Sequence, residues 1–303
     1  MNGFIIVDKP QNYTSRDIVN IVSKKLNTRK IGHTGTLDPI ATGVLVLCIG
    51  GTTNLVEIMT SDEKEYIAEI TLGYETDTLD STGKILNKNY TYKSKEEIIN
   101  ALKKYNTEYM QQVPLYSAVK VNGERLYDYA FNNETPKEIP SRLVNIKKLE
   151  LISDIEYTKD TIIFKIRCLV SKGTYIRSLI RDIAKELNTI GVMSSLRRTR
   201  QGNFKIEDAI TISDINNGNI KVHDIMEALT KYKTYEMDEN LYFKVKNGSP
   251  LENIYIKDDD CVLFTYNKKP IYLYKKGTED KTIIKPWKIF NYNITRWKYK
   301  RFW

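Results

Sequence analysis

The stretch of residues 32–50 constrains the fold more than any other part of the chain. It reads GHTGTLDPIATGVLVLCIG: a loop rich in Gly, Thr and Pro with one histidine and one acid, followed by an apolar run. The apolar run predicts a buried strand. Asp38 precedes Pro39, and a residue before proline is pushed into an extended conformation, so the backbone aims its side chain. Two interpretations stay open: Asp38 caps a short helix that begins at Pro39, or its carboxylate is held out for chemistry.

The same loop excludes several common kinds of site. Gly32, Gly35 and Gly43 permit the close turns and backbone approaches that a ligand-facing loop needs. Their spacing is neither G-x-G-x-x-G nor G-x-x-x-x-G-K-[ST], which argues against dinucleotide and P-loop phosphate sites. The chain has no Gly-x-Ser-x-Gly elbow and only two histidines. An aspartate nucleophile at Asp38 remains compatible with the pattern.

The charge balance indicates a polyanionic partner. Lys and Arg outnumber Asp and Glu by 47 to 38, a formal net charge of +9, which favours nucleic acid or an anionic membrane surface. A Lys-rich codon bias would give the same number. No apolar run approaches the roughly 20 residues of a membrane span, and the opening residues are too short an apolar run for a signal peptide.

The cysteines and histidines favour a cytoplasmic protein without a metal site. Cys48, Cys168 and Cys261 lie far apart, in or beside apolar runs, which predicts buried free thiols in a reducing compartment. With two histidines and no Cys-x-x-Cys, a zinc site is not expected.

Periodicity predicts alternating strands and helices. Expected strands cover 3–8, 64–72, 144–156 and 161–170; expected helices cover 14–26, with Thr14 or Ser15 as cap, 95–105, with a Ser94 and Glu97 capping box, and 174–187. Residues 111–142 contain three prolines and several tyrosines and basic residues, which predicts a long loop or hairpin. From about residue 231 the pattern changes to short strands, YFKVKNGSPL among them, so we place a domain boundary there.

Three further features are open to two interpretations each. Arg177 falls in the first turn of its predicted helix, where the helix dipole disfavours a cation; its partner is Asp182, solvent, or Asp38, which it would keep ionised. Tyr66 is one of 21 tyrosines and fits a plain strand aromatic. The C-terminal tail from Lys281 interleaves basic residues with all three tryptophans, which suits phosphate contact and base stacking or packing on its own domain.

Several stretches together resemble the TruB tRNA pseudouridine synthases. They are IIVDKP, GHTGTLDPIATGVLVLCIG, KEYIAEITLGYETDTLDSTG, PLYSAVKVNGERLYDYA, SKGTYIRSLIRDIA and SSLRRTRQGNF, within residues 3–230. A weaker likeness to a PUA-like domain covers about 235–290. The resemblance implies an α+β pseudouridine synthase fold: a central mixed, largely antiparallel sheet flanked by helices, plus a small β-rich PUA-like domain. Residues 1–230 would be catalytic, with a thumb-like insertion at 111–142, and residues 231–303 would bind RNA.

The resemblance also implies roles for individual residues. The family's catalytic aspartate falls on Asp38, its active-site tyrosine on Tyr66 and the arginine that pairs with the aspartate on Arg177. The residues implied in substrate binding are the apolar pocket residue Leu196, the histidine His33 that enters the space left by flipped bases, Lys9 near the active site, and Lys120 and Arg125 of the thumb.

The implied reaction converts a T-loop uridine, at tRNA position 55, to pseudouridine. Breaking and remaking a glycosidic bond at one sugar carbon is redox-neutral, so no cofactor or metal is expected. The stacked target base must be flipped out, and an aromatic ring such as Tyr66 can then hold its face. Direct attack of Asp38 on C1′ and a glycal-like intermediate both stay open. The expected partner is tRNA, and the expected state is a monomer with no obligate protein partner.

The sequence departs from the family pattern at three positions. Asn12 stands where many relatives have Gly, and Asn visits left-handed conformations more readily than most residues. Asn54 and Phe131 replace a Lys and an Arg that relatives often have.

Three other functions are compatible with parts of the sequence. A non-catalytic RNA-binding protein or tRNA-folding chaperone would not need Asp38. A glycoside hydrolase needs a second carboxylate ~5 to 9.5 Å away, for which Asp80 is the nearest candidate. A guide-RNA-dependent synthase is a third, although the thumb-like segment and small C-terminal domain favour a stand-alone enzyme.

Overall fold

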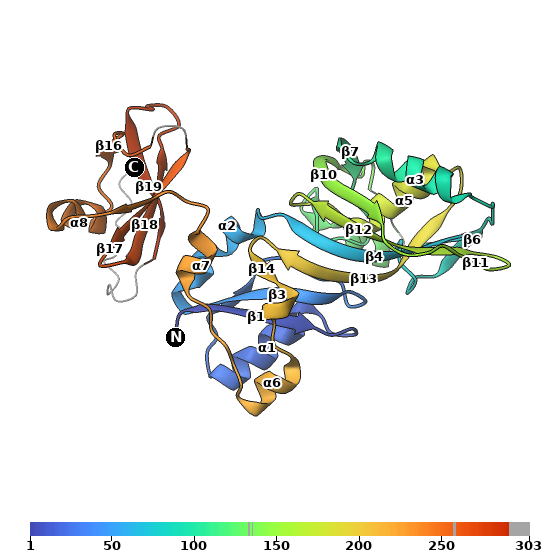
Figure 1. Ribbon diagram of the computed structural model, residues 1–303, viewed down its shortest axis with the longest axis horizontal. Helices are drawn as coiled ribbons and strands as arrows, with labels where there is room; N and C mark the ends of the chain where they lie inside the picture. Colours follow the sequence, from blue (N-terminus) through green and yellow to red (C-terminus); the bar gives the residue numbers. More distant parts are fainter. Residues whose placement is uncertain (133, 135, 257–258, 291–303) are drawn as a thin grey trace.

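The computed structural model describes residues 1–132, 134, 136–256 and 259–290, which form two lobes (Figure 1). The larger lobe is built on a ten-stranded sheet. Its main order is β1 (Gly3–Lys9), β3 (Thr42–Ile49), β13 (Gly191–Gln201), β4 (Lys64–Leu72), β12 (Ile162–Val170), β10 (Ser141–Leu151) and β7 (Glu108–Gln112), with β2 (Ile31–His33), β11 (Glu156–Tyr157) and β14 (Phe204–Lys205) beside it. Among the strand pairs that the structure describes in this sheet, β3 and β13 alone are parallel. The expected mixed, largely antiparallel sheet is confirmed.

Four helices cover one face of this sheet and form the main core with it. They are α1 (Ser15–Leu26), α3 (Lys95–Lys104), α5 (Ile176–Glu186) and α6 (Ile212–Asn217). Each presents apolar side chains at helical spacing, as on α5, where Leu179, Ile180 and Ile183 are fully buried. The alternating residues Tyr66 to Leu72 of β4 meet these helices from the sheet, so the predicted half-buried strand is confirmed.

The strand after the Gly-rich loop is buried on both faces. Alternate residues of β3 point to the helix-covered core, while Val44, Val46 and Cys48 join a second apolar cluster. That cluster includes η1 (Gly50–Leu55), α2 (Val56–Thr60) and α7 (Ile225–Leu229), and η2 (Ile206–Asp208) packs against it. Double burial is the reason that the apolar run of this strand does not alternate.

Local capping explains where two predicted helices begin. Thr14 is the cap of α1 and shares a capping box with Asp17, and Ser94 does the same with Glu97 for α3. Ser15, the other cap candidate, is buried and bonds the backbone of Leu37 instead. Asn12 has a φ of 68°, the left-handed conformation expected for its position.

The segment at 111–142, predicted as a long loop or hairpin, contains a hairpin and is shorter than predicted. Its first two and last two residues belong to β7 and β10, which leaves residues 113–140 as the thumb segment. The thumb segment contains a hairpin of β8 (Lys120–Val121) and β9 (Glu124–Arg125), followed by the short helix α4 (Leu126–Phe131). A second small hairpin, β5 (Tyr74–Thr76) with β6 (Ile85–Lys88), follows β4.

The smaller lobe is a five-stranded sheet in the order β15 (Thr234–Glu236), β17 (Cys261–Tyr266), β18 (Lys269–Lys276), β19 (Ile283–Ile289) and β16 (Leu251–Glu252). The predicted strand at YFKVK is wrong, because α8 (Glu239–Lys246) occupies it. Asp238 caps this helix through the Leu241 amide, and Val245 lies buried on its inner face. Strand propensity of Tyr, Phe and Val is overridden by this cap and packing.

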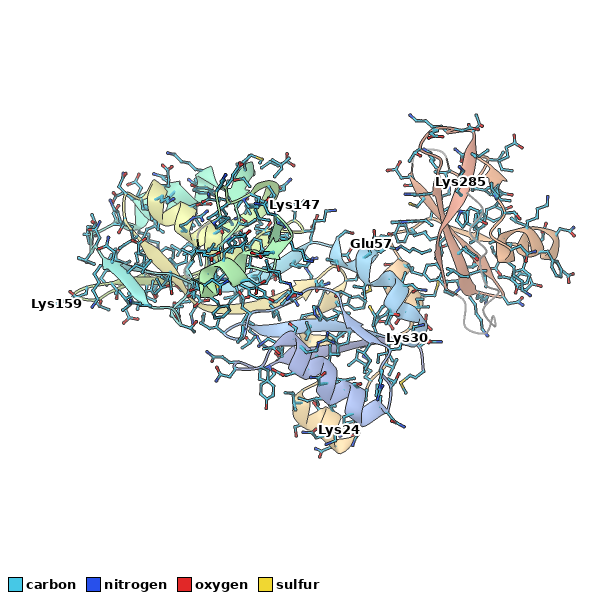
Figure 2. All side chains as sticks on the ribbon, turned by 180° about the vertical axis from the view of Figure 1, so that it is seen from behind. Lys24, Lys30, Glu57, Lys147, Lys159 and Lys285 are labelled. Atoms are coloured by element: carbon cyan, nitrogen blue, oxygen red, sulfur yellow. The ribbon has the colours of Figure 1, made fainter. Side chains whose placement is uncertain are left out.

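The two lobes are in direct contact. Leu263, Leu273 and Phe290 of the smaller lobe join the apolar cluster on the outer side of β1 and β3. Lys288 pairs with Glu57 of α2 at 2.5 Å, and Figure 2 shows Glu57 on the side of the larger lobe that faces the small sheet. None of the helices in the described ranges is long and apolar enough to cross a membrane.

Candidate active site

A cavity of about 340 Å³ opens where the Asp38 loop, β4, β13, the start of α5 and the thumb segment meet. Four residues predicted for the site line it: Asp38, Tyr66, Arg177 and Leu196. The rest of the lining is Thr36, Leu37, Tyr116, Ser117, Ala118, Tyr127, Thr174, Tyr175, Ile176 and Met193. The fold thus brings together four predicted residues that are up to 158 positions apart in the chain, Asp38 and Leu196 being the extremes.

Asp38 lies in a tight turn and not at the start of a helix. The Ala41 amide donates to the Asp38 carbonyl at 3.0 Å, which closes a single turn through Pro39. The helix-cap interpretation is therefore wrong, because no helix follows. The Asp38 carboxylate is 37% exposed and points to Arg177, whose Nε lies 3.0 Å from Oδ2.

Arg177 connects three segments around the cavity. Besides Asp38, it donates through Nη1 to the Thr78 carbonyl at 2.9 Å and through Nη2 to the Tyr116 carbonyl at 3.1 Å. The side chain is buried, so these bonds fix its position. Asp182, the other candidate partner, pairs with Arg181 instead. The anionic partner that a cation in the first turn of a helix requires is thus Asp38.

Buried side chains clamp the loop on both sides of Asp38. Gln201 Nε2 donates to the Thr34 carbonyl at 3.2 Å, Arg198 Nη2 to Gly35 at 3.0 Å, and Ser15 Oγ to Leu37 at 3.2 Å. Lys9 Nζ lies 3.4 Å from the carbonyl of Pro39. Because buried polar groups are costly to leave unpaired, each of these bonds resists movement of the loop.

Lys9 is a fully buried residue beneath the site. Its ammonium also donates to the carbonyls of Pro10 and Tyr13, at 2.9 and 2.6 Å. Burial lowers the pKa of Lys9 to about 8, Asp38 opposes this effect, and Arg198 adds to it. Lys9 does not line the cavity, so its contacts support the backbone of the Asp38 loop.

Arg198 is the residue that the sequence reasoning missed. It is 1% exposed, donates to the Val44 carbonyl at 2.6 Å, and lies opposite Tyr66 in the pairing of β13 with β4. Burial raises the pKa of Tyr66, while the Arg198 guanidinium and its hydrogen bond to the hydroxyl counteract part of that rise. Side chains two residues apart on a strand point to the same face. Arg198 follows the apolar Leu196 by two residues, and this spacing could have predicted that Arg198 is buried.

Gly43 is required by the close packing of two strands in the sheet. It has a φ of 101°, and a Cβ there would lie 2.2 Å from the Arg198 carbonyl. The close approach that the sequence predicted is therefore between β3 and β13.

Three other predicted residues lie outside the cavity lining. His33 is on β2, half-buried, and its Nδ1 has no hydrogen-bond partner within the described part of the chain. Burial, Arg198 and Arg16 lower its pKa. Lys120 and Arg125 lie opposite each other on the β8 and β9 hairpin of the thumb segment. Trp297 and Trp303 of the tail fall outside the described residues.

The site has a single carboxylate among the lining residues that the structure describes, Asp38. Asp80, the candidate second carboxylate of a hydrolase, is buried elsewhere, where it accepts bonds from Thr78 and Thr82. The paired-carboxylate arrangement of a glycoside hydrolase is therefore not present at this cavity.

Comparison with known families agrees with this geometry. The model described as "TruB family pseudouridylate synthase (N terminal domain)" matches residues 23–176, and that described as "tRNA pseudouridylate synthase B C-terminal domain" matches residues 177–246. The chain belongs to the TruB family. The first model spans Asp38 and Tyr66, and the second begins at Arg177, so both contribute to the cavity.

Relatives in the TruB family match nearly the whole chain. A Clostridium tetani protein named "tRNA pseudouridine synthase B" is 42% identical over 294 residues, 94% of this chain and 99% of the relative. A Bacillus pumilus protein of the same name is 37% identical over 304 residues, 96% and 98% of the two chains. A solved structure, "Crystal Structure of a Cbf5-Nop10-Gar1 Complex", aligns with a TM-score of 0.71 at 26% identity, covering 95% of this chain and 85% of that one.

Proposed function

We propose that this TruB-family pseudouridine synthase isomerises the T-loop uridine at tRNA position 55, with Asp38 acting at C1′ of the flipped nucleotide. The observation that supports this most directly is the Asp38 carboxylate, which stands in the cavity wall and is held by Arg177 at 3.0 Å. A carboxylate oriented by a fixed guanidinium is suited to react at, or stabilise positive charge on, a sugar carbon.

The cavity supplies the surroundings that a detached uracil requires. The Tyr66 ring and the Leu196 and Met193 side chains line it, so an aromatic and two apolar groups can enclose the base while its N1–C1′ bond is broken. The base then turns and C5 bonds to C1′. The proton on C5 leaves to solvent and N1 takes up a proton, so the product is an isomer of the substrate. We propose that the Tyr66 ring stacks on the face of the base, with Arg198 counteracting part of the rise in the Tyr66 pKa that burial causes.

The predicted residues outside the cavity lining have two different roles in this proposal. His33, Lys120 and Arg125 lie outside the cavity lining, on β2 and the thumb hairpin, and we assign them to the backbone and loop of the substrate. Lys9 is fully buried under the Asp38 loop, and we assign it to loop positioning. We also propose that the monomer, with residues 231–303 as a separate RNA-binding domain, is the working form.

The test uses unmodified tRNA that carries tritium at uracil C5. We expect release of one tritium per tRNA, from the T-loop uridine. Asp38→Asn should reduce the release rate by about a thousandfold or more, equivalent to roughly 4 kcal/mol, with tRNA binding retained.

Asp160→Asn is the matched control, because Asp160 is an exposed acid at the turn before β12. It should release tritium at the wild-type rate. Tight tRNA binding without release by the intact protein would instead support a tRNA-folding chaperone, and release from another uridine would contradict the proposed position.

A further inference from the structure

The thumb segment exposes an aromatic ring next to the cavity. Phe131, the last residue of α4, is 74% exposed, the highest value for any aromatic side chain in the described ranges. Single exposed apolar residues are common and need no explanation. Phe131 differs because of its neighbours.

Phe131 belongs to an aromatic cluster that continues into the cavity. Its ring centroid lies 6.3 Å from that of Tyr116 and 6.2 Å from that of Tyr127, with interplanar angles of 82° and 78°. Both tyrosines line the cavity, whereas Phe131 does not. The three rings therefore form one surface that leads from the cavity wall to solvent.

Hydrogen bonds orient the two tyrosines. The Tyr116 hydroxyl donates to Asp77 at 3.2 Å, and its carbonyl accepts from Arg177. The Tyr127 amide donates to the Ser117 carbonyl at 3.1 Å, and the Arg125 guanidinium lies 5.5 Å from the Tyr127 ring centroid. A cation and three rings at the mouth of an RNA-modifying site match the composition of a base-stacking surface.

The position of Phe131 relative to the cavity indicates which nucleotide this surface would contact. Stacked neighbours in a strand are about 3.4 Å apart, and further when unstacked. The ring centroid of Phe131 lies 6.2 Å from that of Tyr127, which lines the cavity. Phe131 thus lies one ring outside the cavity lining, which favours a base next to the flipped uridine over the uridine itself.

We propose that Phe131, supported by Tyr116 and Tyr127, is a stacking subsite for a nucleobase adjacent to the target uridine. The inference rests on the proposed function, because it takes RNA as the occupant of the cavity. A phenyl ring carries no charge and no hydrogen-bonding group, so it offers a nucleotide only a stacking face. The subsite thus adds affinity that is insensitive to salt.

Binding is measured with Asp38→Asn protein and a T-loop hairpin in which each neighbour of the target uridine is replaced in turn by 2-aminopurine. We expect quenching of the fluorescence at one of the two positions. Phe131→Leu should weaken binding by about 5- to 100-fold, abolish that quenching and leave the salt dependence unchanged. Phe131→Tyr should retain both affinity and quenching.

Phe131→Leu separates stacking from packing, because leucine keeps apolar bulk but has no aromatic face. Equal affinity and quenching in the leucine variant and its parent would overturn the proposal, as would a loss confined to variants whose melting temperature also falls. Phe131→Arg should bind with a steeper salt dependence. Tritium release by the wild-type enzyme, measured in parallel, tests the proposed function separately: release without any effect of Phe131→Leu would refute the subsite alone.

Discussion

The Asp38 loop and the thumb segment face each other across one cavity, but they are held in different ways. Four backbone carbonyls of the loop, at Thr34, Gly35, Leu37 and Pro39, lie within hydrogen-bond distance of side chains from β13, α1 and β1. The thumb segment is held mostly by bonds among its own residues, such as the Leu126 amide to the Val119 carbonyl.

This difference matches the tasks of the two regions. A reacting carboxylate must be placed within a fraction of an ångström, and several buried bonds to a rigid sheet achieve this. A surface that receives a large RNA needs less exact placement, and few buried contacts leave it able to adjust. Arg177 is the link, since it bonds both Asp38 and the Tyr116 carbonyl of the thumb segment.

The largest effect on the clamped loop is expected from Arg198→Met. It leaves the carbonyls of Val44 and Gly35 without their buried donor, so the free energy of unfolding should fall by about 2–4 kcal/mol. The rate of tritium release at saturating tRNA should fall at least about tenfold, because both the loop and Tyr66 lose their support.

Arg197→Met is the matched control for this variant. Arg197 is the neighbouring residue, points to the other face of β13, and pairs with Asp8 while 41% exposed. We expect it to cost less than about 1 kcal/mol. Equal losses in the two variants would contradict a special role for Arg198.

A smaller effect is expected from the pH dependence of Lys9. Folding lowers the pKa of Lys9 from 10.5 to about 8, so between these values the unfolded chain binds more protons. The contribution of Lys9 to the free energy of unfolding therefore rises with pH, by on the order of 1 kcal/mol per pH unit. Denaturant unfolding from pH 8 to 10 should show a steeper rise in the wild type than in Lys9→Met, which keeps the rise contributed by Lys64, whose pKa burial also lowers to about 8.

Lys24→Met controls for the loss of a lysine in general. Lys24 is exposed on α1, as Figure 2 shows, and its variant should keep the wild-type pH dependence. If the free energy of unfolding changed with pH equally in the wild type and in Lys9→Met, burial of Lys9 would not disfavour its charged form.

The smallest effect on stability is expected in the thumb segment. Replacing Lys120 and Arg125 together by Ala should change the free energy of unfolding by less than about 0.5 kcal/mol, because both are exposed. The slope of log affinity for tRNA against log salt should become less steep by roughly 1.5, as two phosphate contacts are lost. An unchanged slope would contradict the phosphate contacts of the thumb segment. A large loss of stability would contradict the difference between the thumb segment and the Asp38 loop.

The sequence by itself determined much of the local structure. The cap at Thr14 or Ser15, the capping box of Ser94 and Glu97, the alternation from Tyr66 to Leu72 and the left-handed Asn12 are all local patterns, and the structure confirms each, with Thr14 as the cap. The family motifs contained Asp38, Tyr66, Arg177 and Leu196, which meet at the cavity. Local patterns are readable because neighbours in the chain decide them.

Only the tertiary structure decided how those residues are held and used. Nothing local to Arg177 distinguishes Asp38 from Asp182 as its partner, and nothing local to Ser15 or Lys9 reveals that they bond the loop after Gly35. The strand expected at YFKVK became α8 through its cap and its packing. Partners distant in the chain, the burial of Arg198 and the two-sided burial of β3 depend on which surfaces the fold brings together, and that is a property of the packed chain as a whole.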